Sequence, residues 1–231
     1  MDYEKYGEVF RKGNVTLINC DCMDLMVDAP ENHWQLSIID PPYGIGEIGG
    51  NESRAKSAPS GYDKKNWDNE PPSPEYFREL IRISRNQIIW GANHFMDRIA
   101  LGSPCWIVWD KDNSGDFADC ELAYTSFKTA VRKFHFRWNG MIQGDMKNKE
   151  RRIHPTQKPV KLYDWLLASY AKPGDRILDT HLGSGSSAIA AYYAGHDFVG
   201  IELDEDYFKA AKKRFKENTR QVDIFSEAKT S

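Results

Sequence analysis

Short apolar runs alternate with amphipathic segments along most of the chain. The runs are rich in β-branched and aromatic residues, which is typical of buried strands. We expect strands at Val15–Asn19, Gln35–Asp40, Gln87–Trp90, Cys105–Trp109, Val131–Trp138, Arg176–Asp179 and Phe198–Glu202. Segments with helical spacing lie between them, and this alternation predicts an α/β architecture.

Start and stop signals bound four helices. Ser73 before Pro74 has the order of an N-cap and a proline at the first helical position. Pro173 and Gly174 follow the second helix and Gly195 follows the third, as expected at C-termini, and the fourth is indicated by its apolar stripe. The four segments are the one opened by Ser73 and Pro74, then Val160–Tyr170, Ser186–Ala194 and Glu205–Asn218.

Two stretches lack this regular pattern. Gly44–Pro72 is rich in Gly, Ser, Asn, Pro and charge, and loops of such length inside a compact domain are usually functional. Asn139–Gln157 is strongly basic. It lies within Lys128–Lys161, which contains ten Lys and Arg but only two acidic residues. The whole chain, in contrast, has a net charge of −3. A local basic stretch on an acidic body fits the docking of a polyanion, and equally a solvated basic loop.

Composition places the chain among ordinary globular proteins. Its 231 residues are 40% hydrophobic, with a mean hydropathy of −0.65, which fits one domain over residues 1–231. No apolar run is long enough to span a membrane, and the acidic, aromatic Met1–Arg11 is not a signal peptide. The four cysteines lack the spacing of a zinc site, so we expect reduced thiols, no metal and a cytoplasmic protein.

An acid and two prolines follow the apolar strand that ends near Ile39. Asp40-Pro41-Pro42-Tyr43 fixes a carboxylate, a carbonyl and an aromatic face in one small volume at a strand end, where α/β sheets bind ligands. Two acceptors on an exocyclic amine of a nucleobase localise its lone pair, and the ring can stack on a flipped base. A plain turn is the alternative.

A glycine-containing loop joins a strand to a helix further along the chain. Asp179, His181, Gly183, Ser184 and Gly185 belong to it, and Glu202 follows the next strand. Glycines allow a ligand to approach the backbone at a helix N-terminus, and an acid so placed commonly binds ribose hydroxyls. The pattern predicts nucleotide binding without separating a nicotinamide cofactor from S-adenosylmethionine.

These motifs and their order resemble the β-class amino DNA methyltransferases, the adenine-N6 and cytosine-N4 methylases. Asp40-Pro41-Pro42-Tyr43 comes first, then His154-Pro155-Thr156-Gln157-Lys158-Pro159, then the glycine loop, then Gly200-Ile201-Glu202-Leu203-Asp204. The resemblance covers nearly the whole chain, from the strand before Asp21 to the helix after Glu202. By itself the His154–Pro159 segment indicates only a polar loop before a helix.

The resemblance implies a role for each matching residue. Asp40, Pro41, Pro42 and Tyr43 would be catalytic. The residues that would bind S-adenosylmethionine are Asp21, Thr156, Gln157, Lys158, Pro159, Asp179, His181, Gly183, Ser184, Gly185 and Glu202. Among them, Asp21 would bond the adenine amine of the cofactor and Glu202 its ribose. His181 stands where the family usually has Phe, and we expect it to pack rather than to bond the cofactor carboxylate.

The implied fold is a Rossmann-like methyltransferase fold with a seven-stranded mixed sheet and a circularly permuted motif order. The strand at Val15 would lie beside the strand at Phe198, because the adenine and ribose acids must converge on one ligand. The implied activity is methyl transfer to N6 of a flipped adenine in double-stranded DNA, with cytosine N4 as the alternative. Residues 44–72 and 111–152 would contact DNA. The setting would be a bacterium or a phage-infected cell. A homodimer, a cognate restriction endonuclease and an orphan or phage role stay open.

Other classes of protein fit the sequence less well. A nicotinamide dehydrogenase would leave Asp40–Tyr43 unexplained, and a binding module with a vestigial pocket would not need it. A cytosine carbon-5 methyltransferase would need Cys105 as nucleophile, but that residue opens an apolar strand and is expected in the core. RNA and protein methylases of related fold tend to carry Asn rather than Asp before Pro-Pro-Tyr.

Overall fold

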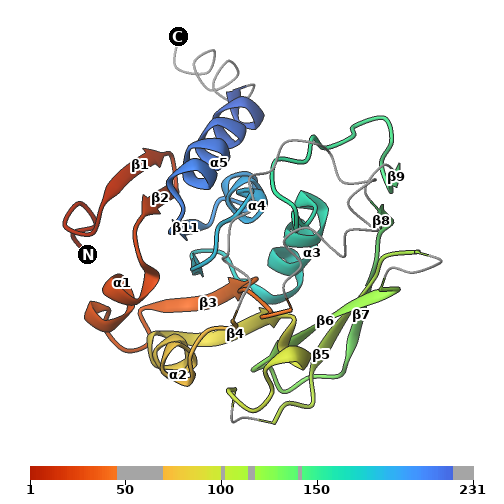
Figure 1. Cartoon of the computed structure of the whole chain (residues 1–231), viewed down its shortest axis with the longest axis horizontal. Helices are drawn as coiled ribbons and strands as arrows, with labels where there is room; N and C mark the ends of the chain where they lie inside the picture. The colour runs from red at the N-terminus through yellow and green to blue at the C-terminus, as the bar shows by residue number, and fades with distance from the viewer. Residues whose placement is uncertain (46–69, 100–101, 114–117, 140–141, 221–231) are drawn as a thin grey trace.

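The computed structural model describes residues 1–45, 70–99, 102–113, 118–139 and 142–220. Within these ranges one sheet has nine strands in the order β1-β2-β11-β10-β3-β4-β6-β5-β7 (Figure 1). The strands are β1 Glu8–Lys12, β2 Val15–Asn19, β3 Trp34–Ile39, β4 Ser84–Trp90, β5 Trp106–Asp110, β6 Cys120–Thr125, β7 Arg132–His135, β10 Arg176–Asp179 and β11 Asp197–Glu202. A separate hairpin pairs β8 Trp138–Asn139 with β9 Ile142–Gln143.

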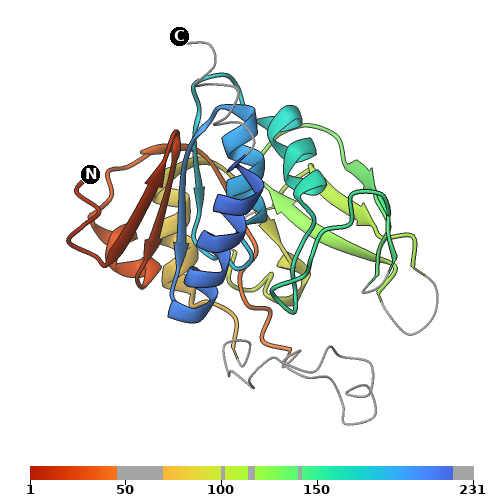
Figure 2. The ribbon, with the colours of Figure 1, turned by 90° about the horizontal axis from the view of Figure 1, so that it is seen from above.

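In the part of the chain that the structure describes, five α-helices cover the two faces of this sheet (Figures 1 and 2). They are α1 Cys22–Asp28, α2 Pro74–Ile83, α3 Val160–Tyr170, α4 Ser186–Ala194 and α5 Glu205–Asn218. Helices α3, α4 and α5 share one hydrophobic core with one face of the sheet, and α1 and α2 share a second core with the other. Successive strand residues point to opposite faces, so Ile38 enters the first core and Ile39 the second.

The four expected helices are confirmed, because their signals are local. Ser73 caps α2 by accepting a hydrogen bond from the backbone nitrogen of Tyr76 at 3.3 Å, and Pro74 opens the helix. Gly195 closes α4 in the left-handed conformation, with φ of 75°. Helix α1 was not expected. It is only seven residues long and is opened by Asp21 as its N-cap.

The expectation of seven strands is wrong, since the described sheet has nine. Strand β1 is an edge strand whose exposed and half-buried positions give no continuous apolar run. Strand β6 lies antiparallel between β4 and β5, and it opens with the exposed Cys120 and the charged Glu121. Both strands are stabilised mainly by their neighbours, so the local pattern does not reveal them.

Strands β2, β11, β10, β3 and β4 are mutually parallel, so their carboxyl ends meet at one edge of the sheet. The expected pairing of the first and last predicted strands is confirmed, with Val15 opposite Phe198. Cys105 is fully buried, as expected for a core thiol. Within the described residues, no helix is long and apolar enough to cross a membrane.

Candidate active site

A row of acids follows the parallel strands along their carboxyl edge. In spatial order, Asp21 follows β2, Glu202 ends β11, Asp179 ends β10 and Asp40 follows β3. Neighbouring strands lie about 4.8 Å apart, so the four positions extend over roughly 15 Å. The tertiary structure therefore brings the predicted catalytic motif and the predicted nucleotide loop to one edge.

Asp40 and Tyr43 are held together by a buried lysine. The Tyr43 hydroxyl donates to Asp40 Oδ1 at 2.8 Å, and Lys158 Nζ lies 2.6 Å from the same oxygen. Lys158 Nζ also donates to the Tyr43 hydroxyl at 3.1 Å. The Lys158 side chain is only 4% exposed. Of the residues that the resemblance assigned to the cofactor, Lys158 thus lies against the catalytic motif.

The Tyr43 ring occupies a position that a glycine makes available. It stacks on His94, with centroids 5.1 Å apart and planes 15° apart. Gly91, just after β4, has φ of 66°, and a Cβ there would lie 2.1 Å from the ring. Gly91 is therefore required for both its backbone conformation and the approach of Tyr43.

Glu121 on β6 is the second anion beside Lys158. Its Oε2 lies 3.0 Å from Lys158 Nζ, and Lys111 pairs with its other oxygen. Burial acts to raise the pKa of Glu121, but the two lysines outweigh it and lower the pKa to about 2. Burial likewise acts to lower the pKa of Lys158, and its two carboxylate partners raise it on balance. Sequence reasoning missed Glu121, because the strand that carries it was not recognised.

Asp179 holds the glycine loop in shape. Ser187 Oγ donates to one of its oxygens at 2.6 Å, and the backbone nitrogen of His181 donates to the other at 3.0 Å. Its side chain is buried, and this desolvation raises its pKa to about 7. Asp179 thus contacts its own loop rather than open space.

Glu202 is fixed at the end of β11 by two backbone donors. Gly183 N donates to Oε2 at 2.8 Å and Asp204 N donates to Oε1 at 3.0 Å. Burial nevertheless raises the pKa of Glu202. Gly183 and Gly185 have φ of 52° and 74°, a left-handed backbone conformation that residues other than glycine rarely adopt.

His181 belongs to the same loop, and its side chain packs against Tyr76 of α2. Its ring meets Tyr76 edge to face with centroids 5.4 Å apart, and its Nδ1 lies 3.0 Å from Thr180 Oγ1. Burial lowers the pKa of His181 to about 4, so the ring is neutral at pH 7. Asp21, in contrast, is exposed and caps α1 by accepting from Met23 N at 2.8 Å.

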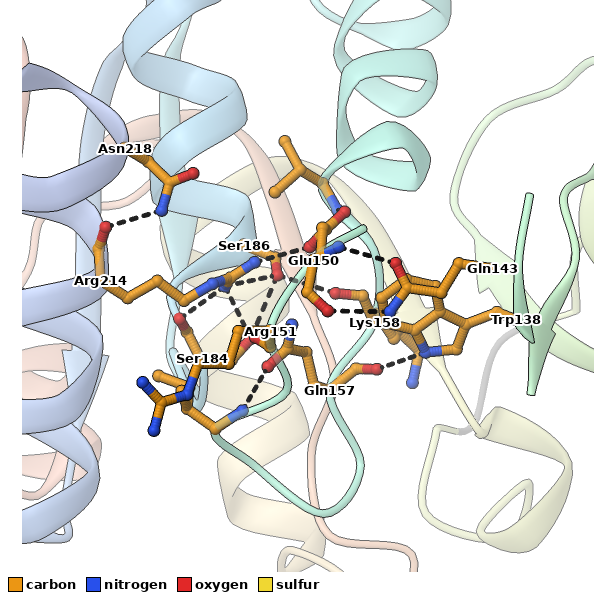
Figure 3. A network of polar contacts seen from close by, with 12 residues as sticks. Trp138, Gln143, Glu150, Arg151, Gln157, Lys158, Ser184, Ser186, Arg214 and Asn218 are labelled. Atoms are coloured by element: carbon orange, nitrogen blue, oxygen red, sulfur yellow. Dashed lines mark hydrogen bonds and ion pairs between the residues drawn. The ribbon is translucent and has the colours of Figure 1, made fainter. Parts of the chain in front are cut away.

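The remaining residues of the His154–Pro159 segment make contacts that hold the segment in place. Thr156 contacts His154, and Pro159 precedes α3. The Gln157 side chain accepts from Ile153 N at 2.9 Å, while its carbonyl accepts from Trp138 Nε1 at 2.8 Å (Figure 3).

A buried ion pair, also missed from sequence, ties this segment to the glycine loop. Arg214 on α5 pairs with Glu150 at 2.6 Å and donates to the Ser184 carbonyl at 2.8 Å and to Ser186 Oγ at 2.9 Å (Figure 3). Ser186 in turn donates to the Lys158 carbonyl at 2.7 Å. The sequence signal for this buried pair was the position of Arg214 within the apolar stripe of α5.

The two stretches predicted to contact DNA lie only partly within the described residues. Most of the 44–72 stretch, residues 46–69, lies outside the described residues, as do 114–117 and 140–141 of the 111–152 stretch. The described part of the latter contains β6, β7 and the β8–β9 hairpin, so it is partly sheet rather than loop. Among the described residues, no group of three or more His, Cys, Asp or Glu could hold a metal ion.

Comparisons with known proteins agree with this arrangement. A family model described as DNA methylase matches residues 109–213. The type II methyltransferase M2.LlaDCHI of Lactococcus lactis subsp. cremoris is 25% identical, over 91% of this chain and 94% of that protein.

Solved structures share the fold. The crystal structure of the M1.HpyAVI–SAM complex matches with a TM-score of 0.56 at 20% identity, over 87% of this chain and 99% of that one. PvuII DNA methyltransferase, described as cytosine-N4-specific, matches with a TM-score of 0.59 at 12% identity, over 90% of each chain. The expected methyltransferase fold is thus confirmed. With the motif order and the family match, these findings confirm the resemblance of this chain to the amino DNA methyltransferases.

Proposed function

We propose that this protein transfers a methyl group from S-adenosylmethionine to N6 of an adenine flipped out of duplex DNA. The observation that carries the proposal is the row of acids along one sheet edge, with Asp40 and Tyr43 at one end and Glu202 and Asp21 at the other. A base at the Asp40 end and a nucleoside cofactor at the Glu202 end would meet in the middle, beside the glycine loop.

The residues present fit such a cofactor. Glu202 has its carboxylate fixed by backbone donors at a strand end, as an acid that binds ribose hydroxyls requires. Leu203 beside it is 70% exposed, which offers an apolar surface to an adenine ring. The exposed Asp21 carboxylate follows the adjacent strand and would accept from the adenine amine. Gly183 and Gly185 allow the backbone to approach the rest of the molecule.

When bound, the cofactor supplies an electrophilic methyl group on a sulfonium. Asp40 accepts a hydrogen bond from the target amine, which favours a localised lone pair on nitrogen. The target nitrogen would bond to that methyl carbon as the carbon–sulfur bond breaks, and the electron pair of that bond would remain on sulfur. The amine proton passes to Asp40, and Tyr43 keeps the base in line by stacking.

The choice of adenine rests on one residue. Asp40 precedes Pro-Pro-Tyr, whereas family members that act on the cytosine amine more often carry Ser there. Cytosine N4 is the second candidate, because a structural neighbour is described as cytosine-N4-specific.

Product analysis tests the proposal. Purified protein is incubated with duplex DNA and methyl-labelled S-adenosylmethionine, and the DNA is digested to nucleosides. We expect the label on N6-methyladenine with the wild type and none with Asp40→Ala. Label on cytosine would refute the adenine assignment, and no label on DNA would refute the proposed function.

A further inference from the structure

The side chains around Asp40 form a closed set of charges that the proposed reaction does not by itself require. Lys158 contacts both Asp40 and Glu121, and Lys111 contacts Glu121. The set therefore contains two carboxylates and two ammonium groups. A buried charge persists only when it is paired, so each member depends on the next.

The two donors to Asp40 both bond the same oxygen. Tyr43 and Lys158 reach Oδ1, and among the described residues no donor reaches Oδ2. Within the described residues the carboxylate is therefore held by one oxygen, which leaves the other available to a ligand. Lys158 is itself held from the far side by Glu121, 3.0 Å from its Nζ, and by the ring of Trp90, 5.6 Å away.

We propose that Lys158, anchored by Glu121, is the positioning residue that keeps Asp40 ionised and turns its Oδ2 toward the target amine. This inference rests on the proposed function. It differs from what the family resemblance implied, which was contact of Lys158 with the methionine end of the cofactor. Lys158 acts through Asp40 and touches neither the base nor the methyl group.

Removing Lys158 and removing Glu121 should shift the pKa of Asp40 in opposite directions, because the two groups have opposite charges. The Lys158 cation favours ionised Asp40, so its removal raises the pKa of Asp40 and moves the acidic limb of the pH–rate profile upward. The Glu121 anion disfavours ionised Asp40, so its removal moves the same limb downward. The titratable groups that face this pair from the packed elements are Tyr43, Lys111, Tyr163 and Asp179.

The experiment compares wild type with Lys158→Met, Lys158→Arg and Glu121→Gln. Single-turnover methylation is measured from pH 5 to 9, and cofactor affinity is measured by calorimetry. For Lys158→Met we expect a rate lower by about 10- to 100-fold, an acidic limb higher by about one pH unit or more, and a cofactor Kd within about threefold of wild type. Glu121→Gln should lower the limb, and Lys158→Arg should keep it near wild type because the charge is retained.

A second measurement follows the ¹³C carboxyl signal of Asp40, assigned with Asp40→Asn, and requires no activity. Its titration should move in the same two directions. Equal acidic limbs in wild type and Lys158→Met would overturn the inference, as would a loss of cofactor affinity as large as the loss of rate. If Lys158→Met does not fold, Glu121→Gln provides the test. A shift of the Asp40 titration to lower pH supports the inference, and an unchanged or higher pH overturns it. If the variants show both titration shifts but the wild type transfers no methyl group, the proposed function is refuted and the charge coupling stands.

Discussion

Single acids along the sheet edge differ in what already holds them. Asp40 has an ion pair on one oxygen, Glu202 has two backbone donors, and Asp179 spends both oxygens on its own loop. Asp21 is exposed beyond its capping bond. From these differences we expect separate roles for residues of the same chemical type.

Cofactor binding and catalysis should therefore separate by mutation. Asp40→Ala or Tyr43→Ala should abolish methylation and change the cofactor Kd by no more than a few-fold, because we propose that both act on the base. Glu202→Ala should weaken cofactor binding by about 10- to 100-fold, the value of one or two charged hydrogen bonds. Calorimetric titration of each variant with S-adenosylhomocysteine, the cofactor without its transferable methyl group, measures both affinities. Equal losses in Asp40→Ala and Glu202→Ala would contradict this division.

Gly91 should be intolerant of a side chain. A Cβ there meets the Tyr43 ring at 2.1 Å, and the positive φ adds backbone strain. We expect Gly91→Ala to lower the free energy of unfolding by about 2–4 kcal/mol and to reduce methylation. Gly174→Ala is the matched control, since φ there is 84° and no atom lies within 4 Å of the new Cβ. It should cost about 1–2 kcal/mol and leave activity unchanged, and equal effects would mean that contact with Tyr43 is unimportant.

At the scale of elements, the Arg214–Glu150 pair joins α5 to the glycine loop and to the N-terminus of α3. Glu150 Oε1 accepts from Val160 N at 2.9 Å, which caps that helix from a distance in sequence. Three segments that the sequence presents separately are thus one buried polar network (Figure 3).

Breaking this pair on one side should be costly. Arg214→Met leaves Glu150 buried without its cation, and we expect a loss of about 3–5 kcal/mol in the free energy of unfolding. The double variant with Glu150→Gln should lose less than the sum of the single losses, because no charge is left unpaired. Lys209→Met, which breaks an exposed pair with Glu205 on the same helix, should leave stability nearly unchanged. Denaturant unfolding measures all four, and strict additivity would contradict a coupled network.

Element boundaries also show where sequence reasoning stops. Helices α2, α3, α4 and α5 were predicted with nearly the bounds found, because caps, prolines and glycines are local signals. Strand β6 was missed, and Glu121 with it, because its short, mixed sequence has no clear strand pattern and the strand is stabilised by pairing with β4 and β5.

At the scale of the whole molecule, charge is distributed unevenly. The basic stretch predicted to contact DNA is partly neutralised, since Lys133 and Arg137 pair with acids and Lys158 is buried. Lys147, Lys149 and Arg151 are exposed on the segment between β9 and the site. We expect these three to meet phosphates.

DNA affinity should then depend on salt despite the pI near 6.1. Charge reversal at Lys147, Lys149 or Arg151 should weaken binding to every sequence alike and lower the slope of log K against log salt by about one for each lost contact. Lys172→Glu is the control, because Lys172 precedes β10 at the opposite edge of the sheet. Fluorescence anisotropy at several salt concentrations measures the slopes. An unchanged slope in all three variants would place this surface away from DNA.

The sequence by itself determined which acids stand at the ends of the apolar strands and where most helices begin and end. Asp40, Asp179 and Glu202 each follow an apolar strand, so their place at a ligand-binding edge could be inferred from local pattern and topology rules. Only the tertiary structure decided that Lys158 meets Asp40 and Glu121, and that Arg214 meets Glu150. Those partners come from strands and helices distant along the chain. Their contact depends on the order of strands in the sheet, which burial and pairing of the whole fold determine and no local signal encodes.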